Sequence, residues 1–546
     1  MSNYLPTYQI FAKLFFYTSF LSLALTSFTS CSKTTHSYRI PKETPIVAKM
    51  NSLRIFSKMK HAKNTIMKEI DEIAMRNIAG INLFDELRNS GISFVNIYGF
   101  GDLSPKNKNG YFALAVALKN YKHFEDFLKV FRLTDEIQQG NNYLFIERER
   151  TVLAWNTKEL IFMASDSTSN RDLKKQMYFL MNLKPTESLP AQNPNFVKFQ
   201  QHKADLGLWL NLETLASENP IGTLLQNINL KENYLHALAN FGHGEVHIKT
   251  DYFLDKSLAQ PLISLFKGNI NRQAFANFSI GVPMGYIQLK VDILGLQQFL
   301  KKNRLFTQIQ ETMQHAGMAF EEFMNMFTGD VIFAVKNIRK VRKSEEYYDE
   351  KRNRNSFKFI EKNQPDFALG LLLKNEAKFD TLLNALIQDN ALVKEDEGYL
   401  SLFRGLFLVR KNNAIYFTDN ESIAKDLAAI ENTQPVIKEE HLHLHNTPIW
   451  VHLNRYFFEK IHKFEQEQKA IKNKATISNT TNNNPEQKPV VLEDIKIRVQ
   501  QIQEKYIRSY IDLKFTEKEN MVMYIYQLFK KELQKIIQDQ QAKNKK

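Results

Sequence analysis

Residues 112–120 read FALAVALKN, and residues 367–375 read FALGLLLKN. The match continues without a gap, so that eight of seventeen positions are identical between residues 112–128 and 367–383. Each copy is an apolar run that ends in Asn, which is favoured at helix N-termini because its side chain accepts a backbone N–H. Apolar residues then recur at the i, i+3, i+4, i+7 spacing of an amphipathic helix. Each copy therefore predicts a buried strand, an N-cap at Asn120 or Asn375, and a helix.

The correspondence between the two stretches spreads outward along the chain. Residues 152–166 and 406–420 each predict a strand, a polar turn and a second strand. A short strand that ends in Asn or Asp and leads into a helix-like run occurs four times, at Asn51, Asn211, Asp292 and Asn454. The first and third copies are 241 residues apart, and the second and fourth are 243 apart. These spacings predict a tandem duplication.

The first thirty residues predict export. They contain no Asp or Glu, and their only basic residue, Lys13, precedes the apolar run Leu14–Leu25. This run has the length of a signal-peptide core, roughly 7 to 15 residues, rather than the roughly 20 of a membrane span. The sequence Phe28-Thr29-Ser30-Cys31 resembles a bacterial lipobox, in which the cysteine is acylated and becomes the new N-terminus. An uncleaved N-terminal anchor with an incidental cysteine is the alternative.

The predicted fold class is α+β: two tandem duplicated halves, each an antiparallel sheet with hairpins packed by helices on one side. The expected organisation is a lipoprotein signal peptide at 1–30, a lipid-anchor tether at 31–37, a first repeat at 38–278, a second repeat at 279–540 and a polar tail at 541–546. Two inserted loops, at 336–363 and 466–493, distinguish the second repeat from the first.

Composition narrows the class of protein further. The chain has 546 residues, a formal net charge of +14 and a single cysteine, so no disulfide can form within it. Lysine is spread along the whole chain, and the predicted export argues against a nucleic-acid partner. The expected partners are the membrane, through the N-terminal lipid, and another envelope protein or an anionic glycan or lipid. No cofactor is expected.

The best candidate for metal binding is the alternating run His441-Leu442-His443-Leu444-His445, which has His452 nearby. Alternate residues of a strand share a face, so the imidazoles of His441, His443 and His445 could meet at one transition metal. No Asp or Cys joins them at the usual ligand spacing. A polar approach to the strand at residues 449–453 is the alternative interpretation.

The segment 336–363 is the candidate for binding an anionic surface. It holds ten Lys or Arg and five Asp or Glu, and the candidate cations are Arg339, Lys340, Arg342, Lys343, Arg352 and Arg354. Cations that alternate with aromatic residues can bind anionic polymers or lipid headgroups. Because the charges have both signs, a solvated, salt-bridged hairpin tip is the competing interpretation.

Other motifs argue against common enzyme classes. His243-Gly244-Glu245-Val246-His247 lacks the Glu that directly follows the first His of the zincin motif. Gly99-Phe100-Gly101-Asp102 lacks the third glycine of a dinucleotide-binding fingerprint, which leaves a hairpin turn as its interpretation. The sequence has no phosphate-binding loop and no Gly-x-Ser-x-Gly elbow. No catalytic residue is therefore predicted.

The lipobox, the opening Ile40-Pro41-Lys42-Glu43 and the Asn-terminated strand–helix units together resemble a family of large lipoproteins of Gram-negative bacteria, known only as a domain of unknown function. The resemblance brings no catalytic residues with it. Ser32-Lys33 after Cys31, in place of Asp, is similar to lipoproteins that are sorted to the outer membrane.

Two functions remain open at this point. The favoured one is a lipid-anchored, non-enzymatic binding or interaction module of the outer membrane. The alternative is a ligand-binding or hydrolytic lipoprotein with a site between the two halves, since pockets often form at domain interfaces.

Overall fold

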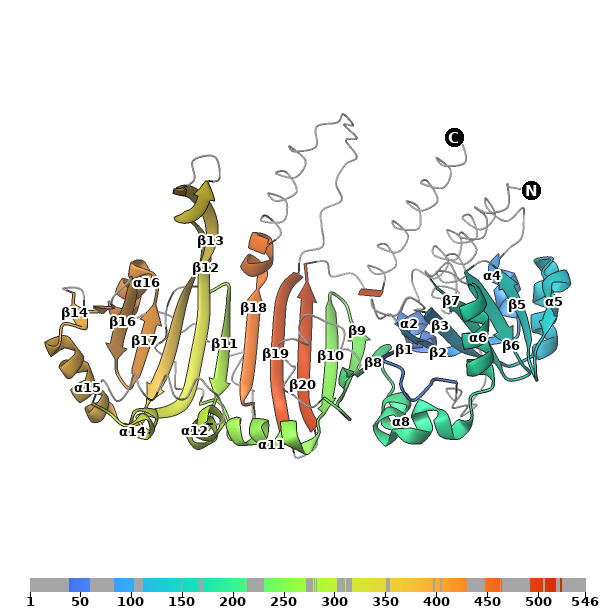
Figure 1. Cartoon of the computed structure of the whole chain (residues 1–546), viewed down its shortest axis with the longest axis horizontal. Coiled ribbons are helices and arrows are strands. Elements are labelled where there is room, and N and C mark those ends of the chain that lie inside the picture. The colour runs from blue at the N-terminus through green and yellow to red at the C-terminus, as the bar shows by residue number, and fades with distance from the viewer. Residues whose placement is uncertain are drawn as a thin grey trace. The chain divides into compact units, whose positions relative to one another are not determined.

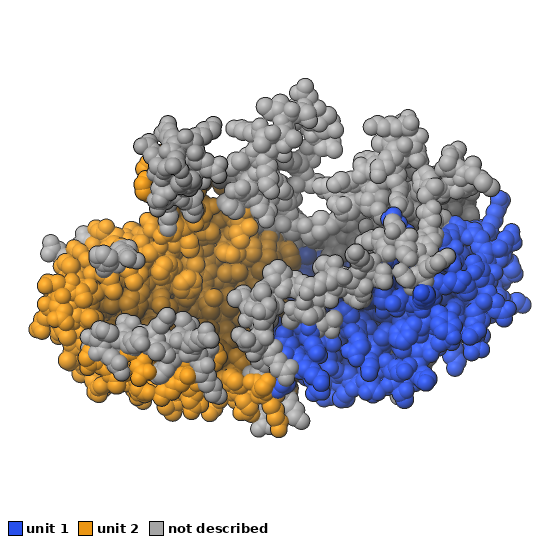
Figure 2. Space-filling model, viewed as in Figure 1, with its two compact units in different colours: residues 1–255, 518–546 blue, residues 256–517 orange. Residues whose placement is uncertain are grey.

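A computed structural model describes the fold. It describes residues 39–58, 83–102, 111–148, 150–165, 170–213, 230–271, 278, 280, 282–301, 310, 317–349, 354–395, 398–402, 405–429, 447–461, 463, 492–503, 506–516 and 521–522. The chain divides into two compact units, with unit 1 comprising residues 1–255 and 518–546 and unit 2 comprising residues 256–517 (Figure 2).

Unit 1 begins with strand β1 and alternates strands with short helices. Its described elements are β1 Ile46–Asn51, α2 Ser52–Lys58, α4 Leu83–Asn89, β2 Ile92–Asp102, β3 Tyr111–Leu118, α5 Tyr121–Val130, β4 Gln138–Gln139, β5 Leu144–Arg148, β6 Thr151–Trp155, β7 Glu159–Ala164, α6 Asn170–Met181, α7 Leu189–Gln192, α8 Pro194–Gln201, β8 Leu206–Asn211, β9 Tyr234–Phe241 and β10 Glu245–Phe253. Neighbouring strands pair in the order β10-β9-β8-β1-β2-β3-β7-β6-β5-β4, and all these pairs are antiparallel.

Unit 2 contains the longest strands of the described chain (Figure 1). Its described elements are α11 Lys256–Leu265, β11 Gly285–Lys290, α12 Ile293–Lys301, α14 Phe320–Met324, β12 Phe327–Asp349, β13 Arg354–Leu373, α15 Glu376–Gln388, β14 Leu392–Lys394, β15 Leu400–Leu402, β16 Leu406–Lys411, β17 Ala414–Thr418, α16 Glu421–Ala428, β18 Ile449–Asn454, β19 Leu492–Gln503 and β20 Tyr506–Phe515. The order of antiparallel neighbours is β20-β19-β18-β11-β12-β13-β17-β16-β15-β14. It is the same as in unit 1 when ten is added to the number of each strand there.

The predicted fold class is wrong. The described strands all belong to antiparallel sheet, which dominates the structure, and the helices do not form the separate layer that the α+β prediction requires. In unit 1, Ala113 and Ala115 of β3 join one buried apolar cluster, whereas Leu118 of the same strand joins another. Because successive strand residues point to opposite faces, the two clusters lie on opposite sides of the sheet.

Helices contribute to both of these clusters. Leu173 of α6 and Phe196 of α8 pack into the first, and Phe124 and Leu128 of α5 pack into the second. Unit 2 is built in the same way, because α16 and α15 each contribute buried residues to a different cluster. A sheet covered on one side would have exposed the second cluster, so burial of apolar area on both faces is what rules out the predicted arrangement.

Several local predictions are confirmed. Asn120 accepts the His123 N–H at 3.2 Å, and Asn375 accepts the Lys378 N–H at 3.1 Å, so both residues cap the helices that follow. The two predicted hairpins are the pairs β6–β7 and β16–β17.

Two segments differ from their prediction. Gly99–Asp102 is no turn, because β2 continues to Asp102 and pairs there with β3. Gly101 lies so close to its neighbour that an added Cβ would be 2.1 Å from the carbonyl oxygen of Tyr111, which explains the glycine in a strand. The predicted loop 336–363 is, in its described part, a continuation of β12 and β13.

Candidate functional site

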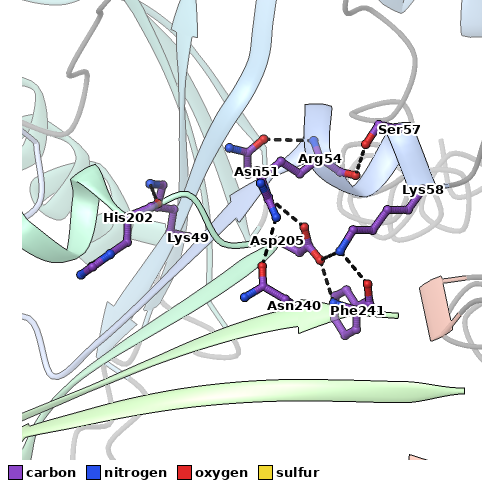
Figure 3. Close-up of polar contacts among 9 residues, drawn as sticks. All are labelled: Lys49, Asn51, Arg54, Ser57, Lys58, His202, Asp205, Asn240 and Phe241. Carbon is purple, nitrogen blue, oxygen red and sulfur yellow. Dashed lines mark hydrogen bonds and ion pairs between the residues drawn. The ribbon is translucent and has the colours of Figure 1, made fainter. Parts of the chain in front are cut away.

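Polar side chains of unit 1 gather where β1 ends and α2 begins, beside the start of β8 and the end of β9 (Figure 3). We call them the Asp205 cluster, and its members are Asn51, Arg54, Ser57, Lys58, Asp205, Asn240 and Phe241. Hydrogen bonds of the main chain bring these segments together, because the Asn51 N–H donates to the Asp205 carbonyl at 2.9 Å.

Asp205 is the centre of the cluster, and its side chain is completely buried. Arg54 Nε donates to Oδ1 at 3.1 Å, and Lys58 Nζ donates to Oδ2 at 2.5 Å. The Phe241 N–H also donates to Oδ2, at 2.7 Å. A buried carboxylate is tolerated when cations and N–H groups satisfy it in this way.

The local sequence explains why two cations reach one carboxylate. Asn51 accepts the Arg54 N–H at 3.1 Å, which starts α2 directly after β1. Arg54 and Lys58 are four residues apart in that helix and therefore lie on one face. Arg54 also donates to Asn240 Oδ1 at 3.2 Å, and Lys58 donates to the Phe241 carbonyl at 2.5 Å.

The cluster is suited to holding α2 against the sheet. Both oxygens of the buried Asp205 carboxylate accept hydrogen bonds, two of them from cations, and such contacts stabilise the ionised form and make it a weak base. Its chemistry is that of a structural anchor that joins three segments distant in sequence.

Lys49 of β1 is buried, unlike Arg54 and Lys58, and it has a different environment. Its Nζ donates to the carbonyl of Gln200 and, at 3.1 Å, to that of His202. Figure 3 shows Lys49 beside His202. Burial lowers the pKa of Lys49 to about 8. The ammonium group therefore holds the segment after α8, and part of it is neutral at moderately alkaline pH.

His236 of β9 and Asp251 of β10 form a buried pair, with 2.9 Å between Nε2 and Oδ2. Lys249 Nζ lies 3.6 Å from the same oxygen. The ring of His202 packs edge-on against His236, with 5.7 Å between centroids, and burial lowers the pKa of His202. These residues surround the pair with aromatic and cationic groups.

A His–Asp pair is part of some catalytic triads, but a nucleophile must then hydrogen-bond the second ring nitrogen. In the described part of the chain, Nδ1 of His236 has no hydrogen-bond partner. Phe253 packs edge-on against the ring with 5.1 Å between centroids, and Trp209 lies on the neighbouring strand, so the surroundings are apolar. The arrangement resembles a buried polar pair of a core more than a reaction centre.

The predicted metal ligands His441, His443 and His445 lie outside the described residues, as does the predicted lipidation site Cys31. Over the described ranges, no three His, Cys, Asp or Glu side chains are grouped as a metal site would need. His452 of β18, the histidine near that run, is used elsewhere: its Nε2 lies 2.5 Å from Asp494 Oδ1. Burial would raise the pKa of Asp494, but the contacts with His452 and Lys496 lower it overall.

The predicted anionic-surface residues are only partly brought together. Arg339 Nε lies 2.7 Å from Asp366 Oδ1, which makes Arg339 part of an internal ion pair. Arg342 lies over the ring of Phe359, with 4.5 Å from its guanidinium carbon to the centroid. Lys340 lies on β12, Arg352 is outside the described residues, and Lys343 and Arg354 are described by their backbone alone.

Reasoning from the sequence missed Lys49, Asp205, His236 and Asp251. A weak signal was present, because Lys49 interrupts the apolar strand at residues 46–50 and His236 interrupts YLHALANF. The pairing β1–β8 joins residues up to 164 positions apart, from Ile46 to Leu210, and no local motif records that separation.

The described residues form a predominantly antiparallel β protein whose buried polar groups pair mostly with one another. The chain belongs to the family described as Domain of unknown function (DUF4836), which it matches over residues 39–455. No curated protein matches the chain.

Three solved structures of a protein named TP0453, in crystal forms IV, I and III, are similar to part of the chain. They are 13%, 11% and 12% identical to it, and each has a TM-score of 0.23. They cover 43%, 44% and 44% of this chain, and 86%, 83% and 84% of their own.

None of the helices in the described ranges combines the length and the apolar composition needed to cross a membrane.

Proposed function

We propose that the chain is a lipid-anchored protein of the Gram-negative cell envelope that acts as a non-enzymatic binding module at the outer membrane. The observation that carries the proposal is the sequence Phe28-Thr29-Ser30-Cys31 directly after the apolar run Leu14–Leu25. A cleaved leader and an acylated Cys31 would tether the protein to a bilayer without a membrane-spanning helix.

The polar clusters support the non-enzymatic part of the proposal. Asp205 is hydrogen-bonded through both oxygens, and Lys49 donates to two main-chain carbonyls. These contacts join segments that are distant in sequence, which is the role of structural rather than catalytic groups.

Acylation is tested by mass spectrometry of the N-terminal peptide of the protein purified from membranes. The expected result is a peptide that begins at Cys31 and carries acyl chains, whereas a Cys31→Ala variant is expected to keep residues 1–30 and to carry no acyl chain. An unmodified Cys31 in the membrane-bound protein would overturn the proposal.

Sorting and binding have separate tests. Ser32→Asp is expected to retain the protein at the inner membrane, whereas Ser32→Ala is expected to leave it at the outer membrane. Crosslinking in cells, followed by purification of the tagged protein, should recover a near-stoichiometric envelope partner that the Cys31→Ala variant loses. A preparation without such a partner would contradict the binding role.

A further inference from the structure

Beyond the body of the sheet in unit 2, β12 and β13 continue as a two-stranded ribbon (Figure 1). β11 pairs with β12 only as far as Val335, and β17 pairs with β13 only from Ala368 onward. Between those limits the described residues of the two strands pair with each other alone. We call the described parts of residues 337–366 the arm.

The base of the arm is firmly attached to unit 2. Arg339 and Asp366 form an ion pair across the two strands, at 2.7 Å. Asp419, which follows β17, accepts a hydrogen bond from Gln364 Nε2 at 2.7 Å and one from the Phe367 N–H at 3.3 Å. The register also shifts between Val335 and Asn337, as in a β-bulge, which changes the direction of a strand.

Farther along the arm, two large aromatic side chains face solvent. Phe357 is 67% exposed and Phe359 is 64% exposed. They are two residues apart in β13 and therefore lie on the same face of the ribbon. Arg342 of β12 lies over Phe359, so a cation accompanies the aromatic pair.

The charge of this segment indicates what could cover the aromatic pair. Residues 336–363 contain ten Lys or Arg and five Asp or Glu, a surplus of positive charge. Exposed single apolar residues are ordinary, but adjacent aromatics within a basic segment have the composition that binds at the surface of an anionic bilayer.

We propose that the arm docks on the anionic headgroups of a lipid bilayer, with Phe357 and Phe359 entering the interfacial region. Arg342, which lies on the aromatic face, would lie among the phosphates, and the net positive charge of residues 336–363 would add a longer-range attraction. This inference deepens the proposed function, on which it rests in requiring that the protein work at a membrane. Pairing of the free strand edges with a second copy of the chain is the alternative that the experiment distinguishes.

Because Cys31 is the only cysteine of the chain, its replacement allows a single thiol to be introduced elsewhere. In a Cys31→Ala background, Ser344→Cys introduces the only thiol, and Ser344 is exposed and directly opposite Phe359 in the register. A polarity-sensitive fluorophore attached there reports on the aromatic face without removing either Phe. Val393→Cys, at a strand position of unit 2 that is 56% exposed, is the matched control.

Vesicles of phosphatidylglycerol and phosphatidylcholine are expected to shift the emission of the probe at position 344 to shorter wavelength. Phosphatidylcholine vesicles should shift it much less, and added salt should reverse the shift, because screening weakens the attraction. The double variant Phe357→Ser/Phe359→Ser should weaken the response about tenfold or more, since it removes the apolar contacts. An Arg342→Gln variant should weaken it to a smaller extent.

Three outcomes would overturn the proposal. They are an unshifted probe at position 344, an equal shift at position 393, and a shift that needs no vesicles and rises with protein concentration, which would indicate self-association. Because the Cys31→Ala chain has no acyl group and the probe reports only its own surroundings, a negative result leaves the mass-spectrometric test of lipidation unaffected.

Discussion

Arg339 of β12 and Asp366 of β13 form an ion pair with 2.7 Å between Nε and Oδ1, and Asp366 is buried. A residue that the sequence places among surface cations is thus part of the structural base of the arm. Arg339 also donates to the main-chain carbonyl of Asp419 at 3.2 Å. The two strands are thereby held together at the point where their neighbours end.

Asp366→Asn is expected to lower the free energy of unfolding by about 1–3 kcal/mol, because it removes the nearer and more buried of the two carboxylates that pair with Arg339 and leaves only Asp419, at 3.9 Å. Urea unfolding followed by tryptophan fluorescence measures the change. Glu459→Gln is the control, since the pair Arg455–Glu459 is exposed and its loss should leave the free energy of unfolding almost unchanged. Equal effects of the two variants would contradict the structural role of Asp366.

Asp205→Asn is expected to cost about 3 kcal/mol, because Arg54 and Lys58 would then lie beside a buried group without a negative charge. Hydrogen exchange should locate the effect in α2, whose amides should lose protection first. The control is Glu43→Gln, which removes only the exposed contact with Lys42. Unchanged protection of α2 in the Asp205→Asn protein would show that the cluster does not anchor that helix.

Lys49 predicts a pH dependence of stability. Its folded-state pKa of about 8 lies below the ordinary value of 10.5, so the folded protein holds this proton less tightly than the unfolded chain. The free energy of unfolding should therefore rise between about pH 8 and pH 10.5, by on the order of 2–3 kcal/mol, and this contribution is lost as the pH falls through 8.

Two substitutions separate this contribution from other titrating groups. Lys49→Met should remove the rise, as measured by urea unfolding at a series of pH values. Lys49→Arg should also remove it while remaining destabilised throughout, because the guanidinium stays charged. A rise of the same size in all three proteins would exclude Lys49 as its source.

Gly329 provides a test of backbone packing in β12. Its φ is +87°, and an added Cβ would lie 1.8 Å from the carbonyl oxygen of Val291. Gly329→Ala should cost more than about 3 kcal/mol or prevent folding of unit 2. Gly317 also has a positive φ, +69°, but nothing within 4 Å of its added Cβ, so Gly317→Ala should cost only about 1 kcal/mol. Thermal unfolding of the two variants makes the comparison.

Local structure was predictable because it depends on neighbours in sequence. The positions of Asn120 and Asn375, followed by apolar residues at helical spacing, were enough to place two N-caps and two helices. The burial of Phe124 and Leu128 follows from the same spacing.

The layer arrangement was not predictable from that spacing, although a signal for it existed. Residues 112–118 are apolar without alternation, which is typical of a strand buried on both faces. The prediction of helices on one side only was based on the hairpins, which are typical of antiparallel sheets with one solvated face, and not on this strand. In the arm, the density of charge suggested a loop and obscured the alternation of Phe357 and Phe359.

The polar clusters could not be predicted from the sequence, for a different reason. Asp205 meets Arg54 and Lys58 across about 150 residues of sequence, and only the pairing of β1 with β8 brings them together. None of these three residues lies in a sequence motif, so their contact depends on the long-range pairing of strands. Acylation of Cys31 and metal binding by His441, His443 and His445 stay predictions.

The two outer edges of the arm have a consequence for how such chains behave when they are crowded on a surface. An unpaired strand edge is a template on which another chain can add a strand, and repeated addition leads to aggregation. Residues 336–363 contain ten basic and five acidic residues, so this segment carries a net positive charge. Two arms that approach edge to edge therefore repel each other, so that the charge which favours an anionic surface also opposes assembly of the arms into fibres.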